Sequence, residues 1–282
     1  MMAVRDKDME KNKRYKNDYN KKRQARRKKA LKIIIFIVML SSILVLFCMS
    51  PLFDISQIQV EGAEHCKEEN IINASGISIG QNGFRYIGGN FRNFIFLRYG
   101  QAELNILNSF PYIKDAVVRY ILPNKVLISI EEREPYALVP YIGAFLLIDR
   151  EGYVLEVTGE KEKFDMPYVK GLRFNNYEIG KALQITNKAN FNKLIILIDA
   201  LTEEEKNDNF KLMNYIDTID VGDVNNIYLY IDSRLIVNYG DLQDINYRIK
   251  ILKNIFHKSL TKEDRGLIDF TVGDNPVFIP EN

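Results

Sequence analysis

Residues that commonly build covalent or metal-bound frameworks are scarce in this chain. In 282 residues there are two cysteines, two histidines and no tryptophan. Cys48 and Cys66 cannot supply the disulfide framework of a small secreted domain, so stability must come from packing. His65 and Cys66 are adjacent, but no second pair stands at metal-ligand spacing, and His257 is distant in the sequence. The sequence therefore predicts no metal site.

Motifs that carry enzyme chemistry are also missing. The sequence has no phosphate-binding loop, no nucleophile elbow and no zincin motif. Residues 76–83 (GISIGQNG) are glycine-rich, but their spacing does not fit a dinucleotide-binding turn and no βαβ pattern surrounds them. We therefore expect no cofactor and no small-molecule substrate, and the sequence gives no catalytic residue.

One cluster of carboxylates could be either catalytic or merely solvated charge. Glu131, Glu132 and Glu134 could suggest a pair of glycosidase carboxylates. Their position beside Arg133 at the end of a predicted strand favours solvated charge or a local ion pair. A membrane-anchored cell-wall enzyme remains the alternative, and it would need an acid/base pair assembled from distant carboxylates such as Glu132 and Asp149.

The longest apolar feature is an uncharged run of 21 residues at positions 33–53. At about 1.5 Å per residue, a helix of this length crosses a hydrocarbon core of roughly 30 Å. A helix also satisfies its own backbone hydrogen bonds in lipid, so we predict a single spanning helix. A cleaved signal peptide would have a shorter core and a small-residue cleavage site. A lipoprotein would need a small residue before Cys48, where Phe47 stands.

Charge is distributed unevenly around this run. Residues 5–32 contain 14 basic and four acidic side chains, whereas the first basic residue after the run is Lys67. Basic residues stay in the cytoplasm, so the N-terminus is predicted inside and the C-terminal part outside. Because the tail carries +10 and the whole chain +2, the remainder carries −8, which argues against an external nucleic-acid surface. We interpret the tail as a juxtamembrane segment attracted to anionic lipid rather than to nucleic acid.

The first external segment alternates strand and helix patterns. Apolar alternation predicts a strand at 55–61. Helical spacing follows at 68–74, and a Gly- and Asn-rich loop at 80–93. A second helix is predicted at 97–110, with Leu97, Leu104, Leu107 and Phe110 on one face. Strands at 116–122 and 125–132 complete a β-α-α-β-β unit, which predicts a small two-layer α+β domain.

The rest of the chain is predicted to be β-rich. A helix begins near Phe191, and a second one follows Asp241, which is placed to cap its N-terminus. Short strands are predicted at 136–141, 144–148, 153–157, 216–221, 227–231, 235–239 and 267–272.

Five stretches, in this order, resemble the FtsQ/DivIB family of bacterial cell-division proteins. They are 53–62 (FDISQIQVEG), 110–123 (FPYIKDAVVRYILP), 128–137 (ISIEEREPYA), 147–155 (LIDREGYVL) and 266–270 (GLIDF) followed by 276–280 (PVFIP). The resemblance implies a basic cytoplasmic tail at 1–32, a transmembrane helix at 33–53, a POTRA-type domain at 54–133 and a β domain at 134–282.

The resemblance also implies a function. Members are non-enzymatic, membrane-anchored scaffolds of septum formation that work with the small bitopic proteins FtsB/DivIC and FtsL. A POTRA-type chaperone of secreted proteins is a further alternative, although such chaperones usually carry several POTRA domains in tandem.

Family members bind their partner by strand addition near the C-terminus, which an open sheet edge would permit. Alternation places Ile268, Phe270 and Val272 on the core side of the last predicted strand and Leu267, Asp269 and Thr271 on the exposed side. The residues expected to bind the partner are Leu267, Ile268, Asp269, Phe270, Thr271 and Val272, with Phe278 and Ile279 as weaker neighbours.

Overall fold

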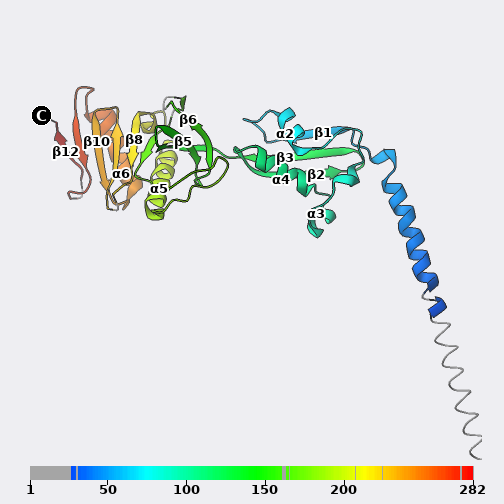
Figure 1. Ribbon diagram of the computed structural model, residues 1–282. Helices are drawn as coiled ribbons and strands as arrows, with labels where there is room; N and C mark the ends of the chain where they lie inside the picture. Colours follow the sequence, from blue (N-terminus) through cyan, green and yellow to red (C-terminus); the bar gives the residue numbers. More distant parts are fainter. Residues whose placement is uncertain are drawn as a thin grey trace, which may run out of the picture. The chain divides into compact units, whose positions relative to one another are not determined.

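The computed structural model describes residues 27–281 apart from 30, 161, 162, 165, 207, 224 and 274. It is a mixed α+β fold with a three-stranded and a nine-stranded sheet (Figure 1). The chain separates into two compact units, one built from residues up to 59 with 77–101 and 118–128, the other from 60–76, 102–117 and 129 onward. Most of the predicted basic tail lies outside the described residues.

The N-terminal helix, Arg27–Cys48, is apolar and long enough to cross a membrane. It ends earlier than the predicted boundary at residue 53. The chain turns at Ser50, whose hydroxyl accepts a hydrogen bond from the Leu52 N–H, and Pro51 opens a separate 3-10 turn, η1 (Pro51–Phe53). Phe53 is buried against Phe84, so this residue belongs to the folded part and not to the apolar helix.

The three-stranded sheet follows the predicted β-α-α-β-β order. Its strands β1 (Gln57–Glu61), β2 (Ile113–Ile121) and β3 (Lys125–Glu132) lie in the order β1-β3-β2. The helices α2 (Glu68–Ser75) and α4 (Gly100–Ser109) come between β1 and β2. In β3, Val126, Ile128 and Ile130 are buried, as the alternation predicted.

Two short helices interrupt the segment that was predicted to be loop. They are η2 (Gly83–Tyr86) and α3 (Phe91–Ile95). Each is begun by an asparagine side chain: Asn82 Oδ1 accepts from the Phe84 N–H at 3.1 Å, and Asn90 Oδ1 accepts from the Asn93 N–H at 2.8 Å. These two caps explain why an Asn-rich stretch is helical in this fold.

Helix α4 starts three residues later than predicted. Leu97 has a positive φ of 51°, and its carbonyl accepts a hydrogen bond from the Tyr120 N–H, so it precedes the helix. The buried face of α4 carries Ala102 and Ile106, whereas Leu104 is exposed. The predicted apolar face was therefore wrong.

The nine-stranded sheet has the order β12-β11-β10-β9-β8-β7-β4-β5-β6. The β4–β7, β7–β8 and β10–β11 pairs are parallel and the others are antiparallel. The strands are β4 (Pro135–Tyr141), β5 (Ala144–Asp149), β6 (Val154–Thr158), β7 (Tyr168–Lys170), β8 (Ile216–Asp220), β9 (Ile227–Ile231), β10 (Leu235–Gly240), β11 (Gly266–Asp269) and β12 (Val277–Pro280).

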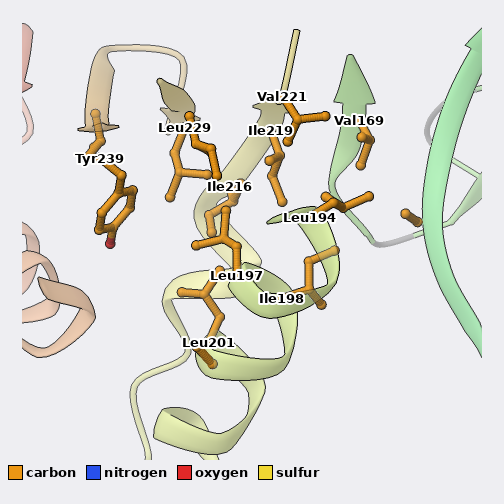
Figure 2. Close-up of a cluster of buried hydrophobic side chains, with 14 of the residues drawn as sticks. Val169, Leu194, Leu197, Ile198, Leu201, Ile216, Ile219, Val221, Leu229 and Tyr239 are labelled. Atoms are coloured by element: carbon orange, nitrogen blue, oxygen red, sulfur yellow. The ribbon is translucent and has the colours of Figure 1, made fainter. Parts of the chain in front are cut away.

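Helices α5 (Lys188–Glu205) and α6 (Ile245–Asn254) pack against this sheet and contribute buried residues to its core. Helix α5 turns Leu194, Leu197 and Leu201 toward sheet residues that include Ile219 and Leu229 (Figure 2). The 3-10 turn η4 (Leu212–Tyr215) leads into β8, and α6 continues into the π-helical turn η5 (Ile255–Ser259).

The predicted cap of α6 was misplaced. Asp241 does not cap the helix, because its Oδ1 accepts from the Gln243 N–H in a turn that precedes it. The helix instead begins after Asp244, which has a positive φ of 52° and makes no side-chain cap.

Candidate partner interface at the open sheet edge

The last predicted strand is shorter than expected and is not an edge. Strand β11 ends at Asp269 and lies between β10, its parallel neighbour, and β12, its antiparallel neighbour. The chain leaves the sheet because Asp269 Oδ1 accepts hydrogen bonds from the Thr271 N–H at 2.7 Å and the Thr271 hydroxyl at 2.6 Å. This turn allows residues 277–280 to return alongside β11, so the open edge belongs to β12.

The predicted split of the strand into a core face and an exposed face fails at Val272. Ile268 and Phe270 are buried, and the Phe270 ring stacks on Tyr239 with centroids 5.1 Å apart. Leu267 and Asp269 are half-buried and Thr271 is exposed. Val272 was expected in the core but is 58% exposed, since it follows the turn and no longer lies in the sheet.

The register of β12 against β11 determines which of its backbone N–H and C=O groups face outward. Leu267 pairs with Ile279 and Asp269 with Val277, and the Glu281 N–H donates to the Arg265 carbonyl. The N–H groups of Gly266 and Phe270 point the other way, to the carbonyls of Arg234, just before β10, and Asn238, within β10. In an antiparallel pair these orientations alternate, so the odd-numbered residues of β12 bond to β11 and Phe278 presents its N–H and C=O to the open side.

Prolines flank this outward position. Pro276 and Pro280 stand two residues before and after Phe278, where the backbone also faces outward, and neither has an N–H group. The open edge of β12 therefore offers one backbone donor, the Phe278 N–H, together with outward carbonyl oxygens. Proline is a known device for limiting uncontrolled edge pairing. An added strand would have to match this single donor.

An apolar row leads to the open edge on the exposed face of the sheet. Directly paired residues share a face, and the register aligns Tyr230, Ile236, Leu267 and Ile279 across four strands. Ile236 is 39% exposed and Ile279 49% exposed, and Val277 beside them is 43% exposed. We call Tyr230, Ile236, Leu267 and Ile279 the apolar row. A strand added to β12 could extend this row with its own apolar side chains.

The opposite end of the sheet is covered at the start of its edge strand. At β6, the Val154 N–H donates to the Lys181 carbonyl, and the Gly180 N–H donates to the Val154 carbonyl. In the part of the chain that the structure describes, no strand lies beyond β12. The β12 end is therefore the more open edge for a partner strand.

Ion pairs form beside the predicted carboxylate cluster, but the partners of Arg133 are Asp149 and Glu151 rather than members of the cluster, and Glu131 pairs with Lys114. Arg133 and Asp149 are both buried and their side chains meet at 2.6 Å, with Glu151 3.1 Å from the same guanidinium nitrogen. The guanidinium also lies 3.5 Å from the Tyr153 ring centroid. Hydrogen bonds from Arg133 and Lys114 lower the pKa of Glu151.

The Glu132 carboxylate is held by His65 and Cys66 and takes no part in the Arg133 ion pairs. It accepts from the backbone N–H groups of His65 and Cys66 and lies 2.7 Å from His65 Nδ1. Burial acts to raise the pKa of Glu132, but these hydrogen bonds outweigh burial and lower the pKa. Asp149 and Glu132, the carboxylates considered for an acid/base pair, are thus both engaged by donors. Within the described ranges, no group of three or more His, Cys, Asp or Glu side chains could hold a metal ion.

The fold and the apolar helix define a class of protein. Residues 53–133 match the family described as POTRA domain, FtsQ-type. This domain is followed by a β-rich C-terminal region and preceded by one apolar helix that is consistent with a membrane anchor.

Similarity to whole proteins narrows the class. The chain is 31% identical over 252 residues to the cell division protein DivIB of Clostridium tetani (strain Massachusetts / E88), covering 86% of this chain and 85% of the relative. It is 27% identical over 258 residues to DivIB of Clostridium botulinum (strain Hall), covering 91% and 93%. The cell division protein FtsQ of Koribacter versatilis matches at 23% over 184 residues, covering 65% and 48%. The chain belongs to the DivIB/FtsQ family of cell division proteins.

Proposed function

We propose that this division protein is a non-enzymatic scaffold of septum formation, anchored in the cell membrane by one helix. Its extracytoplasmic part, comprising a POTRA-type domain at 54–133 and a β domain at 134–282, links FtsB/DivIC-like and FtsL-like bitopic partners. The N-terminus is cytoplasmic, because residues 5–32 carry 14 basic and four acidic side chains. The scaffold is enriched at the division septum.

The observation that carries the proposal is the open edge of β12. Strand addition needs unpaired backbone groups at a sheet edge, and the outward N–H and C=O of Phe278 provide them. Side chains beside such an edge give specificity, and the apolar row supplies exposed Ile236 and Ile279. Of the residues expected to bind the partner, Phe278 carries the outward backbone groups, and Leu267 and Ile279 belong to the apolar row. Ile268 and Phe270 are buried and pack in the core behind this edge.

Site-specific photo-crosslinking in growing cells tests the proposal. A photoreactive phenylalanine analogue replaces Ile279 in the full chain, and a matched analogue replaces Tyr247 on α6, which is 58% exposed. We expect the analogue at 279 to capture a small bitopic partner identifiable by mass spectrometry, and the analogue at 247 to capture none. Equal capture at both positions, or capture at neither, would contradict an interface at β12.

A fluorescent fusion of the full chain tests the septal role independently. We expect a band at midcell in dividing cells. A uniform envelope signal in cells that depend on the fusion for division would contradict enrichment at the septum.

A further inference from the structure

Helix α3 has the reverse of the usual amphipathic pattern. Four large apolar side chains between positions 91 and 96 are exposed: Phe91 (79%), Phe94 (65%), Ile95 (58%) and Phe96 (53%). The residue that α3 turns inward is polar, since Asn93 is only 9% exposed. In Figure 1, α3 stands out as a short projection near α4 and β2. A water-facing helix would place these residues the other way round.

The surrounding backbone holds Asn93 inward. Its side-chain amide donates to the Gly88 carbonyl at 3.2 Å, and its own carbonyl accepts from the Arg98 N–H at 2.8 Å. Gly89 and Gly100 make room for this amide, because a Cβ on either would come within 2.8 Å or 2.5 Å of Asn93 Nδ2. The hydrogen bonds of Asn93 therefore hold α3 in the orientation that exposes the phenylalanines.

The charge around α3 differs in sign from the rest of the external chain. Between Glu69 and Glu103 there is no acidic residue, whereas Arg85, Arg92 and Arg98 fall in this interval. Arg85 and Arg92 are exposed. A local net charge of +3, in a chain whose residues after 32 carry −8 in total, complements an anionic surface.

One of the four exposed apolar residues, Phe94, lies beside the end of the N-terminal helix. Phe94 and Arg85 line an open cleft of about 890 Å³ together with residues of the helix's last turns, which include Leu44, Val45 and Cys48. Asn82, beside this cleft, donates to the Cys48 carbonyl at 2.9 Å. Phe94 thus adjoins the segment that would leave the lipid.

We propose that Phe91, Phe94, Ile95 and Phe96 form an interfacial membrane anchor. They insert into the outer leaflet beside the spanning helix, while Arg85 and Arg92 lie at the phosphates of anionic lipid. The inference rests on the proposed topology, in which the residues after the helix are outside the cell. The lipid surface is preferred over a protein partner because Phe94 lies beside the apolar spanning helix and arginines flank the exposed residues.

Because the chain has no tryptophan, one introduced indole reports its own surroundings. The full chain carrying Phe94→Trp is reconstituted into vesicles of phosphatidylcholine and phosphatidylglycerol with brominated acyl chains. The control is Tyr247→Trp, an exposed aromatic position on α6. We expect blue-shifted emission that loses most of its intensity to the bromine for Phe94→Trp, and water-like, unquenched emission for Tyr247→Trp.

Two results would overturn the anchor. Water-like, unquenched emission from Phe94→Trp would mean that α3 faces solvent. Blue-shifted emission without quenching would mean that protein, such as a second copy of the chain, covers it. Protease digestion of the same vesicles separates this failure from a failure of the proposed topology: if the C-terminal part is on the same side as the tail, the topology itself is wrong.

Discussion

At the scale of single residues, the buried charges have partners that can be tested individually. Arg133 contacts Asp149, Glu151 and the Tyr153 ring, and the Arg133 and Asp149 side chains are only 8% and 6% exposed. The sequence predicted solvated charge or a local ion pair for the carboxylates beside Arg133, and it did not indicate Asp149 as the partner of Arg133. Asp149 lies sixteen residues away on β5, and only the pairing of β4 with β5 brings it near.

Arg133→Met should lower the free energy of unfolding by about 3 to 5 kcal/mol, because it leaves the buried Asp149 carboxylate without its cation. Urea denaturation measures the change. The control is Arg150→Met, which breaks an exposed pair with Asp199 and should cost no more than about 1 kcal/mol. Equal losses in the two variants would mean that the Arg133 pair contributes no more than a surface one.

Glu132 should make stability depend on pH. Its pKa is lowered in the folded state, so its contribution is complete above the unfolded glutamate pKa of about 4.3 and is lost as the pH falls through the lower folded value. Urea unfolding of the wild type and Glu132→Gln should therefore differ most near neutral pH and converge in acid. A difference that grows on acidification would mean that folding raises the pKa of Glu132 instead of lowering it.

At the scale of elements, periodicity located most strands and helices but not their ends. Helix α4 begins after Leu97 because the Leu97 carbonyl bonds to Tyr120 across the fold, and no local pattern signals a contact over that distance. Strand β12 escaped prediction for a different reason. Its three apolar residues, 277–279, stand between Pro276 and Pro280, and prolines ordinarily indicate an edge strand or no strand at all.

Substitutions at two glycines can distinguish the cost of backbone strain from the cost of a steric collision. Gly62 and Gly80 both have positive φ, of 80° and 83°, but a Cβ on Gly62 would lie 2.2 Å from the Ile130 carbonyl oxygen, whereas Gly80 faces open space. Gly80→Ala should cost about 1 to 2 kcal/mol of unfolding free energy from its φ alone. Gly62→Ala should cost clearly more. Thermal unfolding checks both, and equal losses would show that the sheet yields to the added methyl group.

The start of the folded part can be tested with two fragments. Phe53 is 8% exposed, and its carbonyl accepts from the Tyr120 hydroxyl at 2.8 Å. A fragment of residues 50–282 should therefore be more stable than one of 55–282, by about 2 kcal/mol for the buried ring. Phe47, a further neighbour of Phe53, is absent from both. Identical urea midpoints would place Phe53 with the membrane segment, as the apolar run alone suggested.

At the scale of the whole molecule, the order of the motifs and the distribution of charge were enough to predict the family and the α+β fold class. The match of residues 53–133 to the FtsQ-type POTRA domain confirms the family. The open edge of the nine-stranded sheet lies near the predicted strand but not on it. Strand order within a sheet depends on pairing between distant segments, so the sequence could not tell that β11 is interior and β12 outermost. The Thr271 N–H, which an edge at β11 would offer to a partner, instead bonds to Asp269.

We propose that β12 binds the partner strand through the Phe278 backbone. The most direct measurement compares Phe278→Ala with Phe278→Pro in the full chain, as affinity for the FtsB/DivIC-like partner co-reconstituted in vesicles. Both variants lose the ring, and only Phe278→Pro also loses the outward N–H. Loss of one hydrogen bond predicts binding weaker than that of Phe278→Ala by up to roughly tenfold, with circular dichroism unchanged. Equal affinity of two folded variants would contradict strand addition at this edge.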